Sequence, residues 1–222
     1  MQDINFYNSL RRKELIAELI KWGIKDNNVL DAFYKVKREL FVPDEMKKYA
    51  YENKALPIES NQTISQPYTV AFMTELLGVK KGMKILEIGT GSGYQAAILS
   101  ELGAIVYSIE RIENLFNISK TILEKLNYNI KLKCGDGSLG WTEYSPYDGI
   151  IVTAAAPKVP QVLLDQLKIN GVLVIPVGDK SVQQMHKVKK NIDNTGKEEF
   201  VKSVHSSFQF VPLIGKEAWN GK

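Results

Sequence analysis

A predicted strand that runs directly into a glycine-rich segment limits the possible folds of this chain more than any other feature. Residues 84–88 form a short, mostly apolar segment, as in a buried strand, and Gly89, Gly91 and Gly93 follow at alternate positions. Apolar residues then recur at helical spacing over residues 96–102. A strand, a glycine loop and a helix in this order bring backbone N–H groups and a helix N-terminus up to a nucleotide. The sequence therefore predicts a nucleotide site on an α/β fold.

The remainder of the chain supports a doubly wound, mostly parallel sheet. Short apolar segments that alternate with helical patterns are typical of parallel βαβ units. The predicted strands are residues 84–88, 105–109, 130–134, 148–152 and 172–177, and the predicted helices are 70–77, 96–102, 115–126 and 159–167. Residues 184–190 and 200–210 predict a C-terminal β-hairpin around a turn at 193–196.

An N-terminal helical extension precedes this core. Apolar residues from Leu10 to Ile24, with Ile20 between them, recur at spacings of three and four, and Gly23 is placed to end the helix. Asp26 can cap a second helix, which Pro43 interrupts. Residues 53–68 show neither a helical nor a strand period. They predict a long loop, and long loops in compact domains often carry function.

Composition excludes several classes of protein. Twenty-nine Lys and Arg residues against twenty-five Asp and Glu give a formal charge of only +4, spread along the chain, so we expect no nucleic-acid partner. A single cysteine, Cys134, excludes an internal disulfide and fits a reducing compartment, so we expect a cytoplasmic protein. Cys134 ends an alternating segment, which predicts a packed thiol. No apolar run is long enough to span a membrane.

The residues around the glycines indicate which nucleotide fits. A dinucleotide-binding loop needs a small residue where this chain has Tyr94, and no Lys-Ser or Lys-Thr pair of a phosphate-binding loop follows. Carboxylates instead lie at successive strand ends. Glu87 can contact the ammonium group of a methionine moiety, Glu110 can hold both ribose hydroxyls, and Asp136, followed by Gly137, can meet an adenine amino group. Individually, Glu110 could be a surface charge and Asp136–Gly137 a simple turn; together they favour a cofactor without phosphate.

Several segments resemble the protein-L-isoaspartate O-methyltransferases, a family of class I S-adenosylmethionine-dependent methyltransferases. Residues 85–95 resemble the family's first motif, which other methyltransferases share. The segment Gln62-Thr63-Ile64-Ser65-Gln66-Pro67-Tyr68 resembles a substrate segment that is specific to this family. The likeness continues through residues 41–43, 55–58, 107–111, 135–137, 147–155, 163–167, 176–178 and 210–213, and so covers the chain from about residue 10 to residue 213.

This resemblance implies a Rossmann-like methyltransferase that transfers a methyl group from S-adenosylmethionine to the α-carboxylate of L-isoaspartyl residues in damaged proteins. The ester then closes to a succinimide, whose hydrolysis restores some aspartate. The resemblance also implies that Ser65 is the catalytic residue that orients the carboxylate. Pro67, Tyr68 and Val70 are the implied substrate contacts. The implied cofactor ligands are Glu87, Gly89, Gly91, Gly93, Glu110, Asp136 and Gly137. No metal and no histidine base are needed, because a carboxylate is already ionised at neutral pH.

The resemblance also implies one domain over residues 1–222. Residues 1–68 form the extension and substrate loop, 69–213 the cofactor-binding core and 214–222 a tail. Gln209 stands where bacterial relatives usually have arginine, and residues 214–222 match poorly, so we assign them no role. We expect a monomer, although no residue pattern indicates the oligomeric state. Three rival functions remain: methylation of a small molecule or RNA, NAD-linked oxidoreduction, and nucleotide binding without catalysis.

Overall fold

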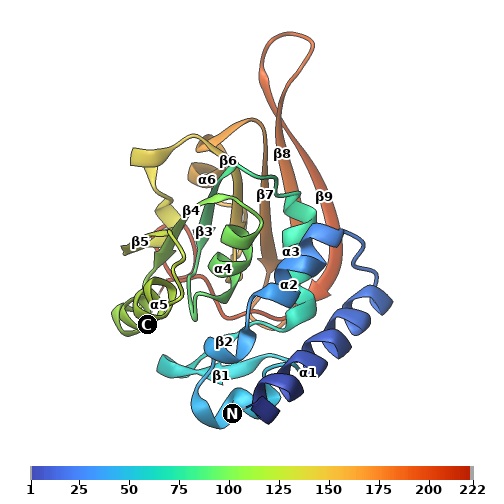
Figure 1. The fold of residues 1–222 in the computed structure, drawn as a ribbon. Coiled ribbons are helices and arrows are strands. Elements are labelled where there is room, and N and C mark those ends of the chain that lie inside the picture. Colours follow the sequence, from blue (N-terminus) through green and yellow to red (C-terminus); the bar gives the residue numbers. More distant parts are fainter. Residues whose placement is uncertain (1, 221–222) are drawn as a thin grey trace.

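The computed structural model describes residues 2–220, so Met1 and the last two residues of the predicted tail, 221–222, lie outside it. A seven-stranded sheet in the order β5-β4-β3-β6-β7-β8-β9 forms the centre of the molecule (Figure 1). A separate two-stranded sheet, β1-β2, lies beside the N-terminal helices. The predicted α/β fold with a C-terminal hairpin is therefore confirmed.

The helices and strands follow the predicted order with a few additions. The α-helices are α1 (Gln2–Lys21), α2 (Asn27–Lys35), α3 (Pro67–Leu77), α4 (Tyr94–Glu101), α5 (Glu113–Lys125) and α6 (Gln161–Asp165). The strands are β1 (Leu56–Ile58), β2 (Gln62–Ile64), β3 (Lys84–Ile88), β4 (Ile105–Glu110), β5 (Lys131–Cys134), β6 (Tyr147–Val152), β7 (Leu167–Gly178), β8 (Gln183–Ile192) and β9 (Glu198–Phe208). Short 3-10 helices are η1 (Arg38–Leu40), η2 (Asp44–Tyr49), η3 (Glu59–Asn61), η4 (Gly137–Leu139) and η5 (Thr142–Tyr144).

The strand order reverses beside β3. From β3 the chain moves outwards through β4 and β5 and then returns to β6 on the other side of β3, and all these pairings are parallel. The carboxyl ends of parallel strands meet at one edge of the sheet, and a crevice opens there where the order reverses. The topology thus places the glycine loop after β3 next to the ends of β4 and β6.

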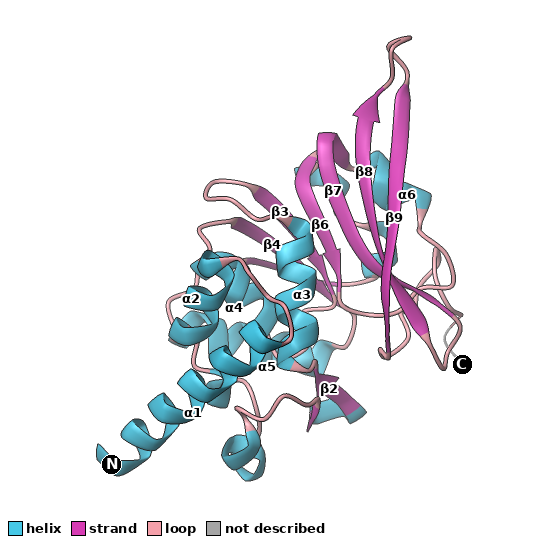
Figure 2. Ribbon diagram, turned by 90° about the vertical axis from the view of Figure 1, so that its right-hand side faces the viewer, coloured by secondary structure: helices cyan, strands magenta, loops and turns pink. Residues whose placement is uncertain are grey.

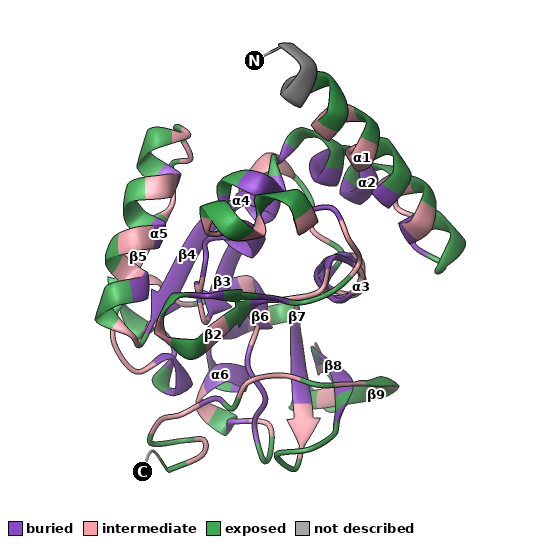
Figure 3. Cartoon of the chain, turned by 90° about the horizontal axis from the view of Figure 1, so that it is seen from below, coloured by how far each residue is buried: buried purple, intermediate pink, exposed green. Residues whose placement is uncertain are grey.

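Both faces of the sheet are covered by helices, as a doubly wound sheet requires. Figure 3 shows buried strands at the centre, with α4 on one side and α6 on the other. Within β3, Ile85 packs with the helices α2 to α4, whereas Leu86 and Ile88 pack with the α6 side. This alternation follows from the two-residue period of a strand. It also means that Glu87 shares the face of Ile85, towards α4.

The N-terminal extension folds as predicted in outline. Gly23 has a φ of 100° and ends α1, and the Asp26 side chain caps α2 by accepting a hydrogen bond from the Asn28 amide at 2.8 Å. Two residues of the predicted apolar stripe are nevertheless exposed, Leu10 by 48% and Ile20 by 54%. The buried face of α1 is the one that meets α2 and α3, and it contains Leu19 of the predicted stripe together with Leu15, which the stripe did not include.

The C-terminal hairpin has a longer first strand than predicted, and its second strand begins and ends two residues earlier. Strands β8 and β9 pair along almost their whole lengths and extend well beyond the helices (Figure 2). Asp193 organises the predicted turn, since its carboxylate accepts hydrogen bonds from the amides of Thr195 at 2.7 Å and Lys197 at 2.9 Å. Gln209, the departure from the resemblance, is exposed immediately after β9.

Four further local predictions were wrong. The segment 53–68 is not a single loop, because residues 56–58 and 62–64 pair as β1 and β2, each too short to show a period. Pro67 and Tyr68 belong to the first turn of α3 rather than to the loop. The helix predicted over residues 159–167 is only α6, because Leu167 pairs with Tyr147 and begins β7. Cys134 is exposed and not packed, because β5 is an edge strand.

No helix within residues 2–220 combines the length and the apolar character needed to cross a membrane.

Candidate active site

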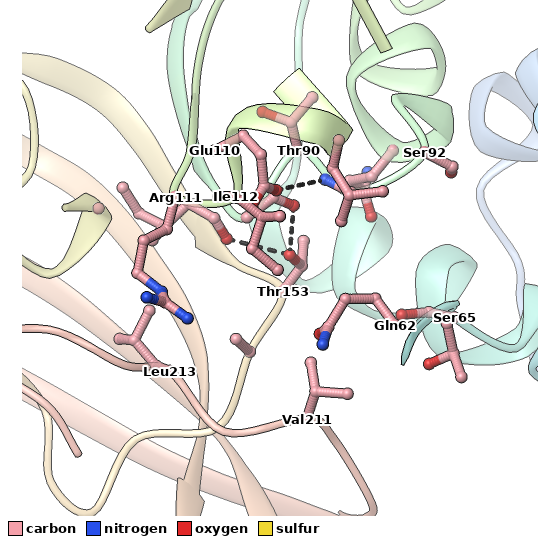
Figure 4. Close-up of a pocket in the computed structure, with 18 of the residues that line it drawn as sticks. Gln62, Ser65, Thr90, Ser92, Glu110, Arg111, Ile112, Thr153, Val211 and Leu213 are labelled. Carbon is pink, nitrogen blue, oxygen red and sulfur yellow. Dashed lines mark hydrogen bonds between the residues drawn. The ribbon is translucent and has the colours of Figure 1, made fainter. Parts of the chain in front are cut away.

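A pocket opens at the carboxyl ends of the parallel strands, where the strand order reverses. The glycine loop after β3, the end of β4 and the end of β6 form one side, and the β2–α3 connection and the chain after β9 form the other (Figure 4). Its lining consists of Gln62, Thr63, Ile64, Ser65, Val70, Met73, Ile88, Gly89, Thr90, Gly91, Ser92, Tyr94, Gln95, Ile109, Glu110, Arg111, Ile112, Leu115, Gly137, Thr153, Ala154, Val211, Pro212, Leu213 and Ile214. The fold therefore brings the predicted cofactor loop and the predicted substrate segment to one cavity.

The glycine loop approaches β6 so closely that a side chain at its first position has no room. Gly89 has a φ of 94°, and a Cβ there would lie 2.5 Å from the Thr153 hydroxyl oxygen. That hydroxyl donates to the carbonyl oxygens of Gly89 at 2.6 Å and Ile88 at 3.0 Å. Thr153 thus ties the loop to the end of β6 and helps to shape the pocket floor.

Glu110 ends β4 with its carboxylate in the pocket lining, where the sequence predicted it. One oxygen accepts a hydrogen bond from the Gly91 amide at 2.8 Å and the other from the Ile112 amide at 2.9 Å (Figure 4). Each carboxylate oxygen can accept a further hydrogen bond. Glu110 can therefore hold the glycine loop in place and still accept two ligand hydroxyls.

Gly137 and Asp136 follow β5, but only Gly137 lines the pocket. A Cβ at Gly137 would lie 2.6 Å from Cγ2 of Ile88, so the glycine permits close approach to β3. The Asp136 carboxylate instead accepts hydrogen bonds from the Ser138 hydroxyl at 2.7 Å and from the Lys216 amide at 2.9 Å. Burial tends to raise the pKa of Asp136, but these hydrogen bonds outweigh it and hold the pKa below its usual range. Asp136 thereby fastens the C-terminal tail beside the pocket.

Glu87 lies beneath the glycine loop and outside the pocket lining. Its side chain is fully buried, and one carboxylate oxygen accepts a short hydrogen bond from the Ser108 hydroxyl. The Ser108 and Thr90 hydroxyl oxygens are 2.6 Å apart, so the chain of contacts continues to a pocket residue. Burial, partly offset by the Ser108 hydrogen bond, raises the pKa of Glu87 to about 8. Gly93 also lies outside the lining, and a Cβ there would meet the Leu123 side chain at 3.2 Å.

Ser65 lies between the end of β2 and the start of α3, on the opposite wall from Glu110 (Figure 4). Its hydroxyl makes no hydrogen bond to any other residue among 2–220, whereas its carbonyl oxygen accepts one from Arg38 at 2.8 Å. The backbone of Ser65 is thus held while the hydroxyl remains free for a ligand.

The three predicted substrate contacts separate in the structure. Val70 lines the pocket beside Ser65. Pro67 is buried at the start of α3, and Tyr68 stacks against Phe72 and Phe208 with ring centroids 5.8 and 6.4 Å away. Pro67 and Tyr68 therefore lie outside the pocket lining.

Sequence reasoning gave no role to several pocket residues. Thr153 and Ile112 could have been found, because Thr153 directly follows the strand predicted at 148–152 and Ile112 comes three residues after the strand predicted at 105–109. Leu213 and Ile214 gave no such signal, and they reach the pocket because the Leu213 amide donates to the Ala155 carbonyl at 2.7 Å. No histidine lines the pocket within the described chain, and no group of three His, Cys, Asp or Glu residues there is close enough to hold a metal ion.

A family model covers almost the whole chain. The family model of protein-L-isoaspartate(D-aspartate) O-methyltransferase matches residues 10–218. The chain belongs to this family. The isoaspartate O-methyltransferase of Cytophaga hutchinsonii is 48% identical over 222 residues, which is 100% of this chain and 98% of that protein. The enzyme of the same name from Chlorobaculum tepidum is 51% identical over 210 residues, covering 94% of this chain and 96% of its own.

Solved structures of the protein-L-isoaspartate O-methyltransferase family share the fold. One structure with this name superposes with a TM-score of 0.83 at 32% identity. The alignment covers 93% of this chain and 67% of the solved chain. A Plasmodium falciparum protein assigned to the same class, solved with S-adenosyl-L-homocysteine, superposes with a TM-score of 0.78 at 25% identity. The alignment covers 91% of this chain and 98% of that protein.

The residues present in this family member fit S-adenosylmethionine. The Glu110 carboxylate can accept hydrogen bonds from ribose hydroxyls, and Gly137 leaves space that a Cβ would occupy. Apolar side chains at Ile88, Ile112 and Leu213 offer surface for a purine ring. Glu110 is the one carboxylate and Arg111 the one cation in the lining within the described residues, so the lining has no cluster of cations that could bind a phosphate.

Replacing Glu110 by alanine should weaken S-adenosylmethionine binding by about 1–3 kcal/mol, because buried polar partners then lose their hydrogen bonds. Calorimetric titration of the wild type and the variant measures this loss. Glu113→Ala is a matched control, since Glu113 is exposed three residues along the chain and lies outside the lining. Equal affinity for Glu110→Ala and the wild type would mean that Glu110 does not contact the ribose.

Proposed function

We propose that this chain transfers a methyl group from S-adenosylmethionine to the α-carboxylate of L-isoaspartyl residues in damaged proteins and peptides. One observation carries the proposal: the Ser65 hydroxyl, free of other partners in the described chain, and the Glu110 carboxylate line the same pocket from opposite walls. A cofactor held at Glu110 and an acceptor held at Ser65 would therefore meet between them.

On the cofactor side, Glu110 holds the ribose and the backbone at Gly137 borders the adenine. Gly89 and Gly91 let the loop backbone approach the remaining part of the cofactor closely. Glu87 acts indirectly in this proposal, as a support beneath the loop through Ser108 and Thr90. Bound S-adenosylmethionine supplies an electrophilic methyl group on a sulfonium.

On the acceptor side, Ser65 donates its hydroxyl proton in a hydrogen bond to the substrate carboxylate and orients it. No base is required, because a carboxyl group with a pKa of about 4 is ionised at neutral pH. Rate enhancement then depends on positioning and on excluding water from two opposite charges. Ile64, Val70 and Met73 supply an apolar wall beside Ser65 for this purpose.

Tyr94 argues against the rival function of NAD-linked oxidoreduction. Tyr94 is fully buried against Phe33 and Phe41, so the close helix–strand contact of a dinucleotide fold is not available there. From the single cysteine we further infer a cytoplasmic enzyme. We also infer that its substrates are proteins and peptides rather than nucleic acid, and that its one domain acts as a monomer.

A labelled methyl-transfer assay tests the proposal with one peptide in two forms. The isoaspartyl form should be methylated at least about tenfold faster than the aspartyl form, since the two place the carboxylate at different distances from the backbone, and a misplacement of about 1 Å can cost a hundredfold. Equal rates for both peptides would contradict the proposed acceptor. Binding of S-adenosylmethionine, measured in parallel, would show whether cofactor use survives that outcome.

A further inference from the structure

A single buried cation contacts both the substrate segment and the cofactor helix. Arg38 begins η1 and is fully buried. One of its terminal nitrogens donates to the Ser65 carbonyl oxygen at 2.8 Å, and its guanidinium lies 4.9 Å from the ring centroid of Tyr94. Tyr94 is the first residue of α4 and directly follows the glycine loop. Arg38 therefore bridges the two sides of the pocket from behind.

Arg38 has no acidic partner to compensate for its burial. Within residues 2–220 no carboxylate oxygen lies within 4.0 Å of its guanidinium, and its Nε and Nη1 atoms have no hydrogen-bond partner. The adjacent Glu39 instead accepts hydrogen bonds from Tyr51 and Asn8. Burial lowers the pKa of Arg38 only to about 10, so the side chain stays cationic at neutral pH. A buried cation without a carboxylate is costly, and an apolar side chain would avoid that cost. Stability of the fold alone therefore does not account for arginine here.

The local backbone explains what Arg38 supplies. Ser65 and Gln66 are the two residues between β2 and α3, so the Ser65 carbonyl has no ladder partner. Asn53 anchors the far end of the connection by accepting from the Gln66 side chain and the Tyr68 amide, both at 2.9 Å. Among the described side chains, Arg38 alone makes a hydrogen bond to Ser65.

We propose that Arg38 is a positioning residue for methyl transfer, which fixes the Ser65 backbone relative to α4 and so aims the Ser65 hydroxyl at the acceptor. This role rests on the function proposed above for Ser65. Arg38 lies outside the pocket lining and touches neither reactant, so it acts through Ser65.

A double-mutant cycle tests this role. Arg38→Met keeps the length and removes the hydrogen bond and the charge. It should lower the single-turnover methylation rate three- to tenfold at saturating cofactor and isoaspartyl peptide, with cofactor affinity within twofold of the wild type. In a Ser65→Ala background, the same Arg38→Met change should lower the rate less than twofold, because the group it aims is gone. Arg38→Lys, which can still donate to the Ser65 carbonyl, should fall between the wild type and Arg38→Met.

Arg12 provides a matched control on α1. Its Nη1 donates to the Tyr34 carbonyl oxygen at 3.1 Å, and its guanidinium lies 5.4 Å from the Tyr34 ring centroid. Arg12 thus makes the same two kinds of contact as Arg38, but outside the pocket lining. Arg12→Met should leave the methylation rate within twofold of the wild type. Thermal unfolding of each variant separates loss of aim from loss of fold.

Three results would overturn the role of Arg38: a wild-type rate for Arg38→Met, a rate loss of equal size in the Ser65→Ala background, or a collapse of cofactor affinity. Should Arg38→Met not fold, Arg38→Lys takes its place in the cycle. It should then be two- to threefold slower than the wild type only when Ser65 is present, and a wild-type rate would overturn the role. Failure of the proposed function is distinct, since it appears as equal methylation of isoaspartyl and aspartyl peptides by the wild-type enzyme.

Discussion

Replacing Glu87 by glutamine should make the protein more stable relative to the wild type at pH 8 than at pH 5, by up to about 3.5 kcal/mol. Burial raises the pKa of Glu87 from 4.5 to about 8. A folded state that binds a proton more tightly than the unfolded chain has its full stabilisation below pH 4.5 and loses it as the pH rises towards 8. The loss is about 1.4 kcal/mol for each pKa unit. Glutamine has no proton to lose, so this dependence disappears.

Denaturant unfolding at pH 5 and pH 8 measures the effect, and the difference between variant and wild type removes the contributions of all other groups. Glu124→Gln is the matched control, because the Glu124 side chain is 67% exposed on α5 and should leave the pH dependence unchanged. A Glu87→Gln protein with the pH dependence of the wild type would show that Glu87 does not hold a proton in the folded state.

The same variant distinguishes two positions for Glu87. If Glu87 supports the loop from beneath, a glutamine that still accepts from Ser108 should keep cofactor affinity near that of the wild type at neutral pH. Direct ionic contact with the ammonium group of the cofactor predicts instead a clear loss of affinity. Titration with S-adenosylmethionine therefore tests where Glu87 acts.

Replacing Ser65 by alanine should lower the methyl-transfer rate about ten- to a hundredfold. One hydrogen bond to a charged group contributes about 1.5–3 kcal/mol, which corresponds to that range of rates. Cofactor affinity should change little, because Ser65 lies on the wall opposite Glu110. Single-turnover methylation at saturating cofactor, combined with a cofactor titration, separates the two effects.

Two further variants sharpen the test of Ser65. Ser65→Thr keeps the hydroxyl but crowds the site with a methyl group, so it should retain part of the rate. Ser207→Ala, on the exposed strand β9, removes a hydroxyl outside the pocket and should have the wild-type rate. A wild-type rate for Ser65→Ala would refute the aiming role, and a collapse in cofactor affinity would assign Ser65 to the cofactor site.

Much of the fold could be predicted because its signals are local. Apolar strand segments, helical periods, the Asp26 cap and the glycine loop each depend on residues that are near one another in the sequence. The position of Glu110 followed from the same logic, since a residue that ends a parallel strand lies at the edge where ligands bind. The errors fell where local signals are weak, as in the three-residue strands β1 and β2 and at the boundary between α6 and β7.

What the sequence by itself determined is the order of strands and helices, the cofactor loop with Glu110 near it and, through resemblance, the family. The tertiary structure alone decided which side chains face the pocket. Glu87 points beneath the loop because the strand alternation places it on the α4 side of the sheet, and Asp136 is occupied by the amide of Lys216, eighty residues away. Arg38 meets Ser65 and Tyr94 only because η1 packs between the β2–α3 connection and α4. Contacts of this kind depend on how distant segments pack, and no local pattern of residues encodes them.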